Sequence, residues 1–313
     1  MLQTMPEPTR QDLSFEWEGL TLAGSAHFPV SSSPRPAVLM MQGSGPADRD
    51  CDGYFPPIRD EFLSRQIATF AFDKPGCGAS TGDWRDYALE ARADQAVAAL
   101  ELLGKHPRID AAGLGVWGQS QGGWLAQIVA ERRPDLAFAI ANSGPSINVI
   151  EQDLYGCEHS MRSAGHPEID IAQALALIAK LHEAARAGAD FATVDAALLN
   201  EARRQPWYGY AEVDDAADWR FGQLLVAECY EPREALARVQ CPFLAVFGGR
   251  DVLVPAWRSA EETGRALEAA GNPDATVVVF AGADHRIRDE TTGDFMAGYL
   301  GLLGDWAVRR AGV

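Results

Sequence analysis

The chain has 313 residues, of which 47% are hydrophobic and 23% charged, a composition that excludes an intrinsically disordered protein. Its 27 lysine and arginine residues face 44 aspartate and glutamate residues, and the net charge of −17 argues against nucleic acid and membrane surfaces as partners. No apolar stretch approaches the roughly 20 residues that span a bilayer, and the N-terminal sequence lacks the apolar run of a secretory signal, so we predict a cytoplasmic protein.

The chain alternates short apolar runs with amphipathic segments. Residues 14–28 alternate apolar and polar positions about Glu18 and Gly19, which is typical of a β-hairpin. The next apolar runs are too short for helices and predict strands buried on both faces, at 37–41, 69–72, 113–117, 137–140, 243–247 and 276–280. Helical spacing predicts helices at 86–103, 120–132, 257–270 and 301–311. This alternation predicts an α/β fold with a mostly parallel central sheet flanked by helices.

One block interrupts the alternation of strands and helices. Between about Pro145 and Arg238 there is no good strand run, and long stretches rich in alanine, leucine and glutamate predict helices. We therefore predict an N-terminal part of the core at 1–144, a helical insertion after the sixth strand at 145–238, and a C-terminal part of the core at 239–313.

The cysteines give no sign of a metal or redox centre. No two of the five have CxxC spacing, so neither a zinc site nor a dithiol is indicated. We expect reduced thiols in a reducing compartment at Cys51, Cys77, Cys157, Cys229 and Cys241.

The strongest chemical signal is the sequence GQSQG at 118–122, between a predicted strand and a predicted helix. A G-x-S-x-G motif in this position predicts a nucleophile elbow, in which glycines relieve crowding and Ser120 presents its hydroxyl. The helix that starts there directs its N-terminal amides at developing negative charge. The alternative is a Gly/Ser-rich turn that only caps the helix.

A serine hydroxyl needs a base to lose its proton near neutral pH. His285 is the histidine that follows the last predicted strand, where a loop would reach the carboxyl edge of the sheet. Asp251 also follows a strand and is the candidate for fixing the imidazole tautomer, with Asp284 as a weaker alternative. Asp251 could instead form a turn or pair with Arg250. We predict Ser120, Asp251 and His285 as the catalytic residues.

Two backbone amides are expected to stabilise the oxyanion. One belongs to Gln121, the residue after the nucleophile. The other should come from the loop 42–46 after the first parallel strand, and we favour the amide of Ser44, with Gly43 close by. A Gly/Pro turn without this role is compatible with the same residues. This chemistry requires no metal and no organic cofactor.

With these motifs in order, the sequence resembles the α/β-hydrolase family of serine esterases and peptidases over nearly its whole length. The resemblance rests on MQGSGPADRD at 41–50, FDKPGCGAS at 72–80, GQSQGG at 118–123, GGRDVLVP at 248–255 and GADH at 282–285. The subgroup it looks most like is the bacterial esterases and S33- or S9-like hydrolases with an HGSGPxDRD loop.

The resemblance implies the α/β-hydrolase fold, the catalytic and oxyanion residues named above, and a lid over the site formed by residues 145–238. The sequence departs from the family at two positions. Gln42 stands where the family has a histidine, which puts the geometry of the oxyanion loop in question, and Pro75 stands where arginine is usual.

Several further groups have both a functional and a structural interpretation. Four aromatic residues of the insertion either line a substrate pocket or pack the helices onto the core: Trp207, Tyr208, Tyr210 and Trp219. Four acidic residues either bind a substrate amine or form a solvated acidic loop, which we favour: Glu212, Asp214, Asp215 and Asp218. Three charged residues either clamp a substrate or, as we favour, shape the oxyanion loop: Asp48, Arg49 and Asp50.

The expected activity is that of a serine hydrolase, carboxylesterase-like, which cleaves a small-molecule ester through an acyl-enzyme. An aminopeptidase or amidase with the same triad is the alternative, and an acyl thioesterase is disfavoured because the acidic charge suits the phosphates of coenzyme A poorly. The non-enzymatic alternative is a binding or scaffold relative of the same fold. Dehalogenases and epoxide hydrolases need aspartate at position 120 and are excluded. The sequence leaves open whether the chain forms a homo-oligomer.

Overall fold

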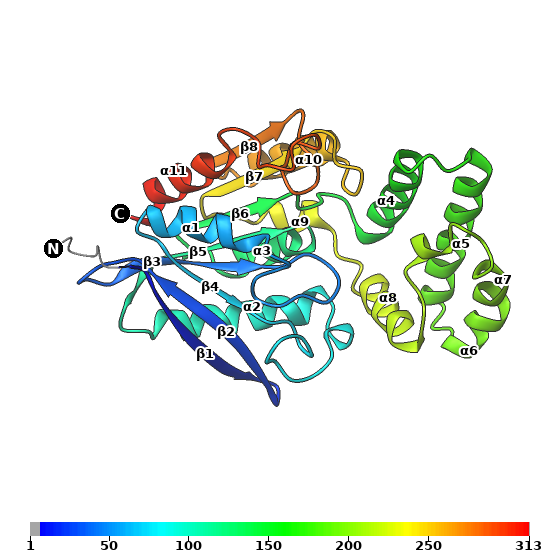
Figure 1. Cartoon of the computed structure of the whole chain (residues 1–313), viewed down its shortest axis with the longest axis horizontal. Coiled ribbons are helices and arrows are strands. Elements are labelled where there is room, and N and C mark those ends of the chain that lie inside the picture. The colour runs from blue at the N-terminus through cyan, green and yellow to red at the C-terminus, as the bar shows by residue number, and fades with distance from the viewer. Residues whose placement is uncertain (1–6, 313) are drawn as a thin grey trace.

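The computed structural model describes residues 7–312 and is built on an eight-stranded sheet (Figure 1). The strands lie in the order β1-β2-β4-β3-β5-β6-β7-β8. The pairs β1–β2 and β2–β4 are antiparallel, and every other neighbouring pair in this order is parallel. Their bounds are β1 (Thr9–Trp17), β2 (Leu20–Phe28), β3 (Arg35–Met41), β4 (Ala68–Phe72), β5 (Ile109–Gln119), β6 (Phe138–Asn142), β7 (Phe243–Gly248) and β8 (Ala275–Phe280). The predicted α/β fold with a mostly parallel sheet is confirmed.

The N-terminal hairpin is also confirmed. Strands β1 and β2 pair antiparallel, and Trp17 lies opposite Leu20. The two turn residues between them, Glu18 and Gly19, both have positive φ, 46° and 82°. A two-residue turn of this kind matches the right-handed twist of the flanking strands.

Helices cover both faces of the sheet, which explains why its central strands are so apolar. Successive residues of β7 alternate between two hydrophobic clusters. Phe243 belongs to the cluster that also contains residues of α2 (Leu89–Gly104), α3 (Gln121–Arg132), α9 (Pro232–Leu236) and α10 (Ala256–Ala269). Leu244 belongs instead to the cluster that contains residues of α1 (Phe55–Ser64) and α11 (Tyr299–Ala311). A strand that is buried on both faces carries apolar side chains on both, so its sequence does not alternate between apolar and polar residues.

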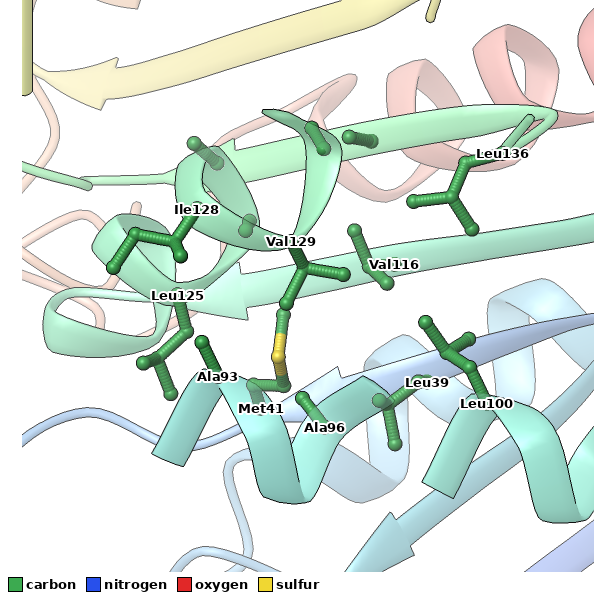
Figure 2. Close-up of a cluster of buried hydrophobic side chains, with 14 of the residues drawn as sticks. Leu39, Met41, Ala93, Ala96, Leu100, Val116, Leu125, Ile128, Val129 and Leu136 are labelled. Atoms are coloured by element: carbon green, nitrogen blue, oxygen red, sulfur yellow. The ribbon is translucent and has the colours of Figure 1, made fainter. Parts of the chain in front are cut away.

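Figure 2 shows part of the first cluster. Met41 of β3, Ala93 of α2, Val116 of β5 and Val129 of α3 come together there, and all four are buried. Alanine on α2 allows the helix to approach the sheet closely. This packing fixes the end of β5 and the start of α3, where Ser120 lies.

Helix α1 is an element that the sequence analysis did not predict. It begins with Phe55, and the prolines that follow occupy its first turn. Proline is a helix breaker in the middle of a helix but is tolerated in the first turn, where the amide would have no partner. The pair of prolines therefore masked a helix whose buried residues Ile58 and Phe62 cover the sheet.

The block between β6 and β7 is helical, and in Figure 1 its helices α4 to α8 lie together beside the sheet. A separate hydrophobic cluster, which includes Met161 and Leu199, holds them together. The elements are α4 (Val149–Ser163), α5 (Glu168–Arg186), α6 (Phe191–Val194), α7 (Asn200–Ala202) and α8 (Ala216–Glu228), with helical turns η2 (Asp195–Leu199) and η3 (Tyr208–Ala211). Within residues 7–312, no helix is both long and apolar enough to cross a bilayer.

Candidate active site

Ser120 occupies a strained turn between β5 and α3. Its φ of 57° and ψ of −119° are unfavourable for a residue with a side chain. Two backbone hydrogen bonds hold the turn: the Ser120 amide donates to the carbonyl of Asn142 at 2.8 Å, and the Gly123 amide donates to the carbonyl of Ser120 at 2.7 Å. The backbone thus places the Ser120 side chain at the first turn of a helix.

The glycines of the motif are required by close backbone contacts. A Cβ atom on Gly118 would lie 1.8 Å from the carbonyl oxygen of Gly122, and one on Gly122 would lie 2.3 Å from the carbonyl oxygen of Met41. Real carbon–oxygen contacts are never this short, so these positions admit no side chain. The local sequence therefore forms the turn that G-x-S-x-G predicts.

His285 and Asp251 are joined by a hydrogen bond. His285 Nδ1 lies 2.7 Å from Asp251 Oδ2, and the Asp251 side chain is fully buried. The other carboxylate oxygen accepts from the amides of Leu253 and Val254 at 2.8 and 2.9 Å. A carboxylate fixed in this way holds the imidazole ring in one orientation and favours the proton on Nδ1, which leaves Nε2 free to act as a base.

The three predicted catalytic residues follow three parallel strands in the same half of the sheet, with β6 between the first two of these strands. Ser120 follows β5, Asp251 follows β7 and His285 follows β8, and because these strands are parallel their carboxyl ends share one edge. In residues 7–312, the Ser120 hydroxyl has no hydrogen bond to His285. Such bonds are often long without substrate and tighten when it binds.

The oxyanion loop lies directly against the elbow. A Cβ atom on Gly43 would lie 3.2 Å from the Cβ of Ser120 and 2.7 Å from the side-chain oxygen of Gln119. The side-chain amide of Gln42 donates to the carbonyls of Asp48 and Phe72 at 3.0 and 2.6 Å. Gln42 therefore ties the loop to β4, so the absence of the family's histidine leaves the loop anchored.

The charges that follow this loop form a local network, as the sequence analysis favoured. Arg49 donates through its backbone amide and Nε to one oxygen of Asp73 at 2.8 and 2.9 Å, and through a terminal nitrogen to the other at 2.5 Å. Asp48 accepts from the amide of Asp50, and Asp50 pairs with Arg59 at 3.0 Å. These contacts shape the loop and occupy the charges that a substrate clamp would need free.

Replacing Asp73 by asparagine is expected to destabilise the fold by about 3 kcal/mol at pH 7, because Arg49 loses the carboxylate that neutralises it. Burial raises the pKa of Asp73, but hydrogen bonds from Arg49 and the Ala79 amide outweigh it, so the pKa lies below its usual value. This stabilisation is present above about pH 4 and disappears as the pH falls through the lowered pKa.

Urea unfolding between pH 3 and 7 measures this effect. The gap in unfolding free energy between wild type and Asp73→Asn should shrink as the pH falls. The exposed Asp60 provides the matched control, because Asp60→Asn should change stability little. A gap for Asp73→Asn that stays constant over this range would contradict the assigned ion pair.

Buried polar side chains connect the elbow with the loop of His285. The Tyr299 hydroxyl donates to the side-chain oxygen of Asn142 at 2.8 Å, and the Asn142 side-chain nitrogen lies 3.4 Å from the Tyr54 hydroxyl. Tyr54 in turn donates to the carbonyl of Arg286 at 3.1 Å. Because the Asn142 carbonyl also accepts from Ser120, this chain holds the two parts of the candidate site in a fixed relation.

Ser120 opens into a cavity of about 650 Å³ between the sheet and helices α4, α5 and α8. Ser44 and Gln121, the residues predicted to supply the oxyanion amides, also line it. Its walls are mostly apolar and include Trp124, Val149, Leu181, Phe221 and Leu225. A cavity of this size and composition suits a small organic molecule.

The four predicted substrate-binding aromatics divide into two pairs. Tyr210 and Trp219 line the cavity. Trp207 and Tyr208 do not line it but lie in the hydrophobic cluster of the helices, 4% and 9% exposed. The Trp207 indole donates to the side chain of Gln173 at 3.3 Å, and the Tyr208 hydroxyl donates to the carbonyl of Val213. Both therefore pack the helices together.

Acidic groups line the part of the cavity formed by the helices. Glu212 and Asp218 belong to the predicted acid cluster, whereas Asp214 and Asp215 do not reach the cavity. Asp153 also lines it, and its carboxylate lies 3.1 Å from Nε2 of His182. Burial, followed by the charges of Asp153 and Asp218, raises the pKa of Glu212.

Four residues at or beneath the site are not predicted by the sequence patterns. Asp153 and His182 lie on helices whose partners could not be deduced from spacing alone. Lys74 and Arg92 are buried, 2% and 5% exposed, and contact the oxyanion loop and Gln121. The available signals were a lysine two residues after a buried strand and an arginine on the apolar side of a helix, both uncommon in a core.

The α/β-hydrolase class is defined by a sheet of this strand order in which a strand, a strained serine and the N-terminus of a helix follow one another. More particularly, the chain belongs to the serine aminopeptidase S33 family, which matches residues 33–292. It is therefore a hydrolase, which acts on small-molecule substrates. Among curated proteins, no sequence match is found.

Solved structures support the same fold. The 2,6-dihydroxy-pseudo-oxynicotine hydrolase superposes with a TM-score of 0.64 at 20% identity, covering 97% of this chain and 68% of its own. An esterase of Pyrococcus furiosus gives 0.66 at 17%, covering 97% and 92%. The esterase Est1E of Butyrivibrio proteoclasticus, with ferulic acid bound, gives 0.59 at 15%, covering 95% and 96%.

Proposed function

We propose that this protein hydrolyses a carboxylic ester through an acyl-enzyme on Ser120, with His285 as the general base and Asp251 as the residue that orients it. The observation that carries this proposal is the hydrogen bond between His285 and the buried Asp251, at the sheet edge where the strained Ser120 lies. Backbone strain at a partly buried serine near an oriented imidazole is typical of an activated nucleophile.

The proposed reaction has two steps. His285 Nε2 removes the hydroxyl proton as Ser120 Oγ attacks the ester carbonyl, and the same proton then passes to the departing alcohol when the carbon–oxygen bond breaks. In the second step His285 activates water, which attacks the acyl-enzyme and releases the acid and free Ser120. The imidazolium formed in each step is stabilised by Asp251.

The amides of Ser44 and Gln121 are proposed to hold the oxyanion. Both residues line the cavity beside Ser120, and the close approach of Gly43 brings the loop within reach of the reacting carbonyl. Gln121 is also the first residue of α3, whose dipole favours negative charge at this point. The absence of a side chain on Gly43 makes this approach possible.

Residues 145–238 are proposed to act as a lid over a core formed by residues 1–144 and 239–313. Their helices supply most of the cavity wall away from Ser120. We propose that Tyr210 and Trp219 contact the substrate there, and that Trp207 and Tyr208 support them by packing. An apolar wall of this kind suits the acyl or alcohol part of an uncharged ester.

A panel of p-nitrophenyl esters and aminoacyl anilides of matched size tests the reaction class. We expect ester turnover that exceeds anilide turnover, because an anilide needs protonation of a poorer leaving group. Cleavage of anilides at rates above those of the esters would replace the esterase proposal by the peptidase alternative.

A second candidate substrate class is favoured by one observation, the acidic lining of the cavity. Asp153, Glu212 and Asp218 could together neutralise a substrate ammonium group, as an aminopeptidase or amidase would require. The name of the matched family, serine aminopeptidase, agrees with this candidate. The esterase and the aminopeptidase or amidase would use the same nucleophile, Ser120, and would differ only in the part of the substrate that the lid residues bind.

Replacing Glu212 by glutamine is expected to lower kcat/KM about tenfold for a p-nitrophenyl ester that bears an α-amino group, because one cation partner is lost. The isosteric ester without the amine should be unaffected. The variant Asp214→Asn, at an exposed carboxylate outside the cavity, is the matched control. Equal losses on the two esters would reject amine recognition by Glu212.

A further inference from the structure

Lys74 lies two residues after the end of β4, beneath the oxyanion loop, and its side chain is almost wholly buried. Its ammonium group donates to the carbonyl oxygen of Gly43 at 2.5 Å and to that of Gly45. It also lies 5.8 Å from the centre of the Trp84 ring. Lys74 thus contacts the loop on both sides of Ser44 without lining the substrate cavity.

No carboxylate neutralises this buried cation within residues 7–312. Arg92 of α2 also lacks a direct ion pair within these residues, although the negative charge of Glu228 acts on it. It donates to the side-chain oxygen of Gln121 and, at 3.4 Å, to the carbonyl of Gln42. Taking an unpaired cation out of water is costly. Two such cations next to the candidate oxyanion site create a positive potential that an anion formed there would relieve.

The connectivity of the loop gives Lys74 a specific route to that anion. The carbonyl of Gly43 and the amide N–H of Ser44 belong to the same peptide group. A cation at the carbonyl oxygen polarises the group and makes its N–H a stronger donor, as in other chains of hydrogen bonds. The amide in question is the one proposed to stabilise the oxyanion.

We propose that Lys74 is a positioning residue that strengthens the oxyanion hole through the Gly43–Ser44 peptide. The inference rests on the proposed function. As the substrate carbonyl carbon becomes tetrahedral, its oxygen gains negative charge and accepts from the Ser44 amide, while the ammonium group balances that charge from the far side of the peptide. No proton leaves Lys74, and its second hydrogen bond, to Gly45, keeps the loop from rotating.

The surroundings of Lys74 bear on its charge. Burial, followed by the positive charge of Arg92, lowers its pKa well below the usual value, and the thiols of Cys51 and Cys77, when ionised, oppose this. A lowered pKa means that the charged form is lost as the pH rises. The pH profile of kcat should therefore fall at alkaline pH, and this fall should reflect the deprotonation of Lys74.

Kinetics of three variants with a neutral p-nitrophenyl ester test the proposal. Lys74→Met removes charge and donors, Lys74→Gln keeps neutral N–H donors, and Lys74→Arg keeps the charge. We expect Met and Gln to lower kcat about 100-fold with KM within about threefold, and Arg to recover part of kcat. Binding of a trifluoromethyl ketone, which forms an oxyanion with the nucleophilic serine, should weaken by the same factor as kcat/KM.

Thermal melts and the pH profile separate this role from a structural one. Lys74→Gln should lack the alkaline limb of the wild type, and if Lys74→Met does not fold, the Gln variant carries the comparison alone. The exposed Lys105 supplies the control Lys105→Met, which should match wild type. A Gln variant with wild-type kcat, or unchanged affinity for the ketone, would overturn the proposal. If Ser120→Ala retains turnover, the proposed function itself fails.

Discussion

Replacing Ser120 by alanine is expected to lower kcat for ester hydrolysis about a million-fold, to the residual rate that binding and the oxyanion hole provide. The reason is that no other group can form the acyl-enzyme at this turn. Substrate affinity should persist, because the cavity and its lid helices are unchanged. Stopped-time assays with high enzyme concentration, together with equilibrium binding of a substrate analogue, measure both quantities.

The matched control for this variant is Ser33→Ala, at an exposed loop serine remote from the sheet edge. It should retain wild-type kcat and KM. Alanine at position 120 should also relieve no strain, because the positive φ remains unfavourable for any side chain. Retention of more than about one per cent of kcat by Ser120→Ala would contradict the assignment of the nucleophile.

Replacing Asp251 by asparagine is expected to lower kcat about 10⁴-fold at neutral pH. The amide would favour the wrong imidazole tautomer, with the proton on the nitrogen that must act as the base, and would no longer stabilise the imidazolium. KM should change little, because Asp251 is buried behind His285. Steady-state kinetics between pH 6 and 9 test this result.

Asp284 supplies the matched control for that experiment, since it is the acidic residue next to His285 in the chain. Its carboxylate accepts from the amides of Arg286 and Arg288, both at 2.8 Å. Asp284→Asn should therefore retain most of kcat and lose some stability. A large loss of kcat with Asp284→Asn and a small loss with Asp251→Asn would contradict this assignment and make Asp284 the residue that orients His285.

Most of the sheet could be predicted because its strands are apolar on both faces and are followed by turn residues. The pattern of Phe243 to Phe247, for example, has no polar alternation and is too short for a helix. The hairpin could be predicted for a similar reason, because its turn is formed by two residues that are adjacent in the sequence, Glu18 and Gly19. Helix α1 escaped prediction because its stability comes from packing against the sheet, which outweighs the local signal of two prolines.

The site could be predicted where one backbone feature dictates one chemical role. The turn around Ser120 needs glycine at fixed positions, and parallel strands bring distant residues such as Asp251 and His285 to one edge. No such rule reveals Lys74 or Arg92, because their role depends on which carbonyls or amides lie above them. The cavity lining had the same difficulty: spacing did not show that Tyr210 faces inward while Tyr208 packs between helices.

Mapping the adduct of a fluorophosphonate probe tests the account most directly, because the probe phosphonylates only a nucleophile activated beside an oxyanion hole. We predict one adduct, on the peptide that contains Ser120, and its loss in Asp251→Asn. An adduct on a different residue, or an ester-hydrolysing protein that the probe does not label, would contradict the account.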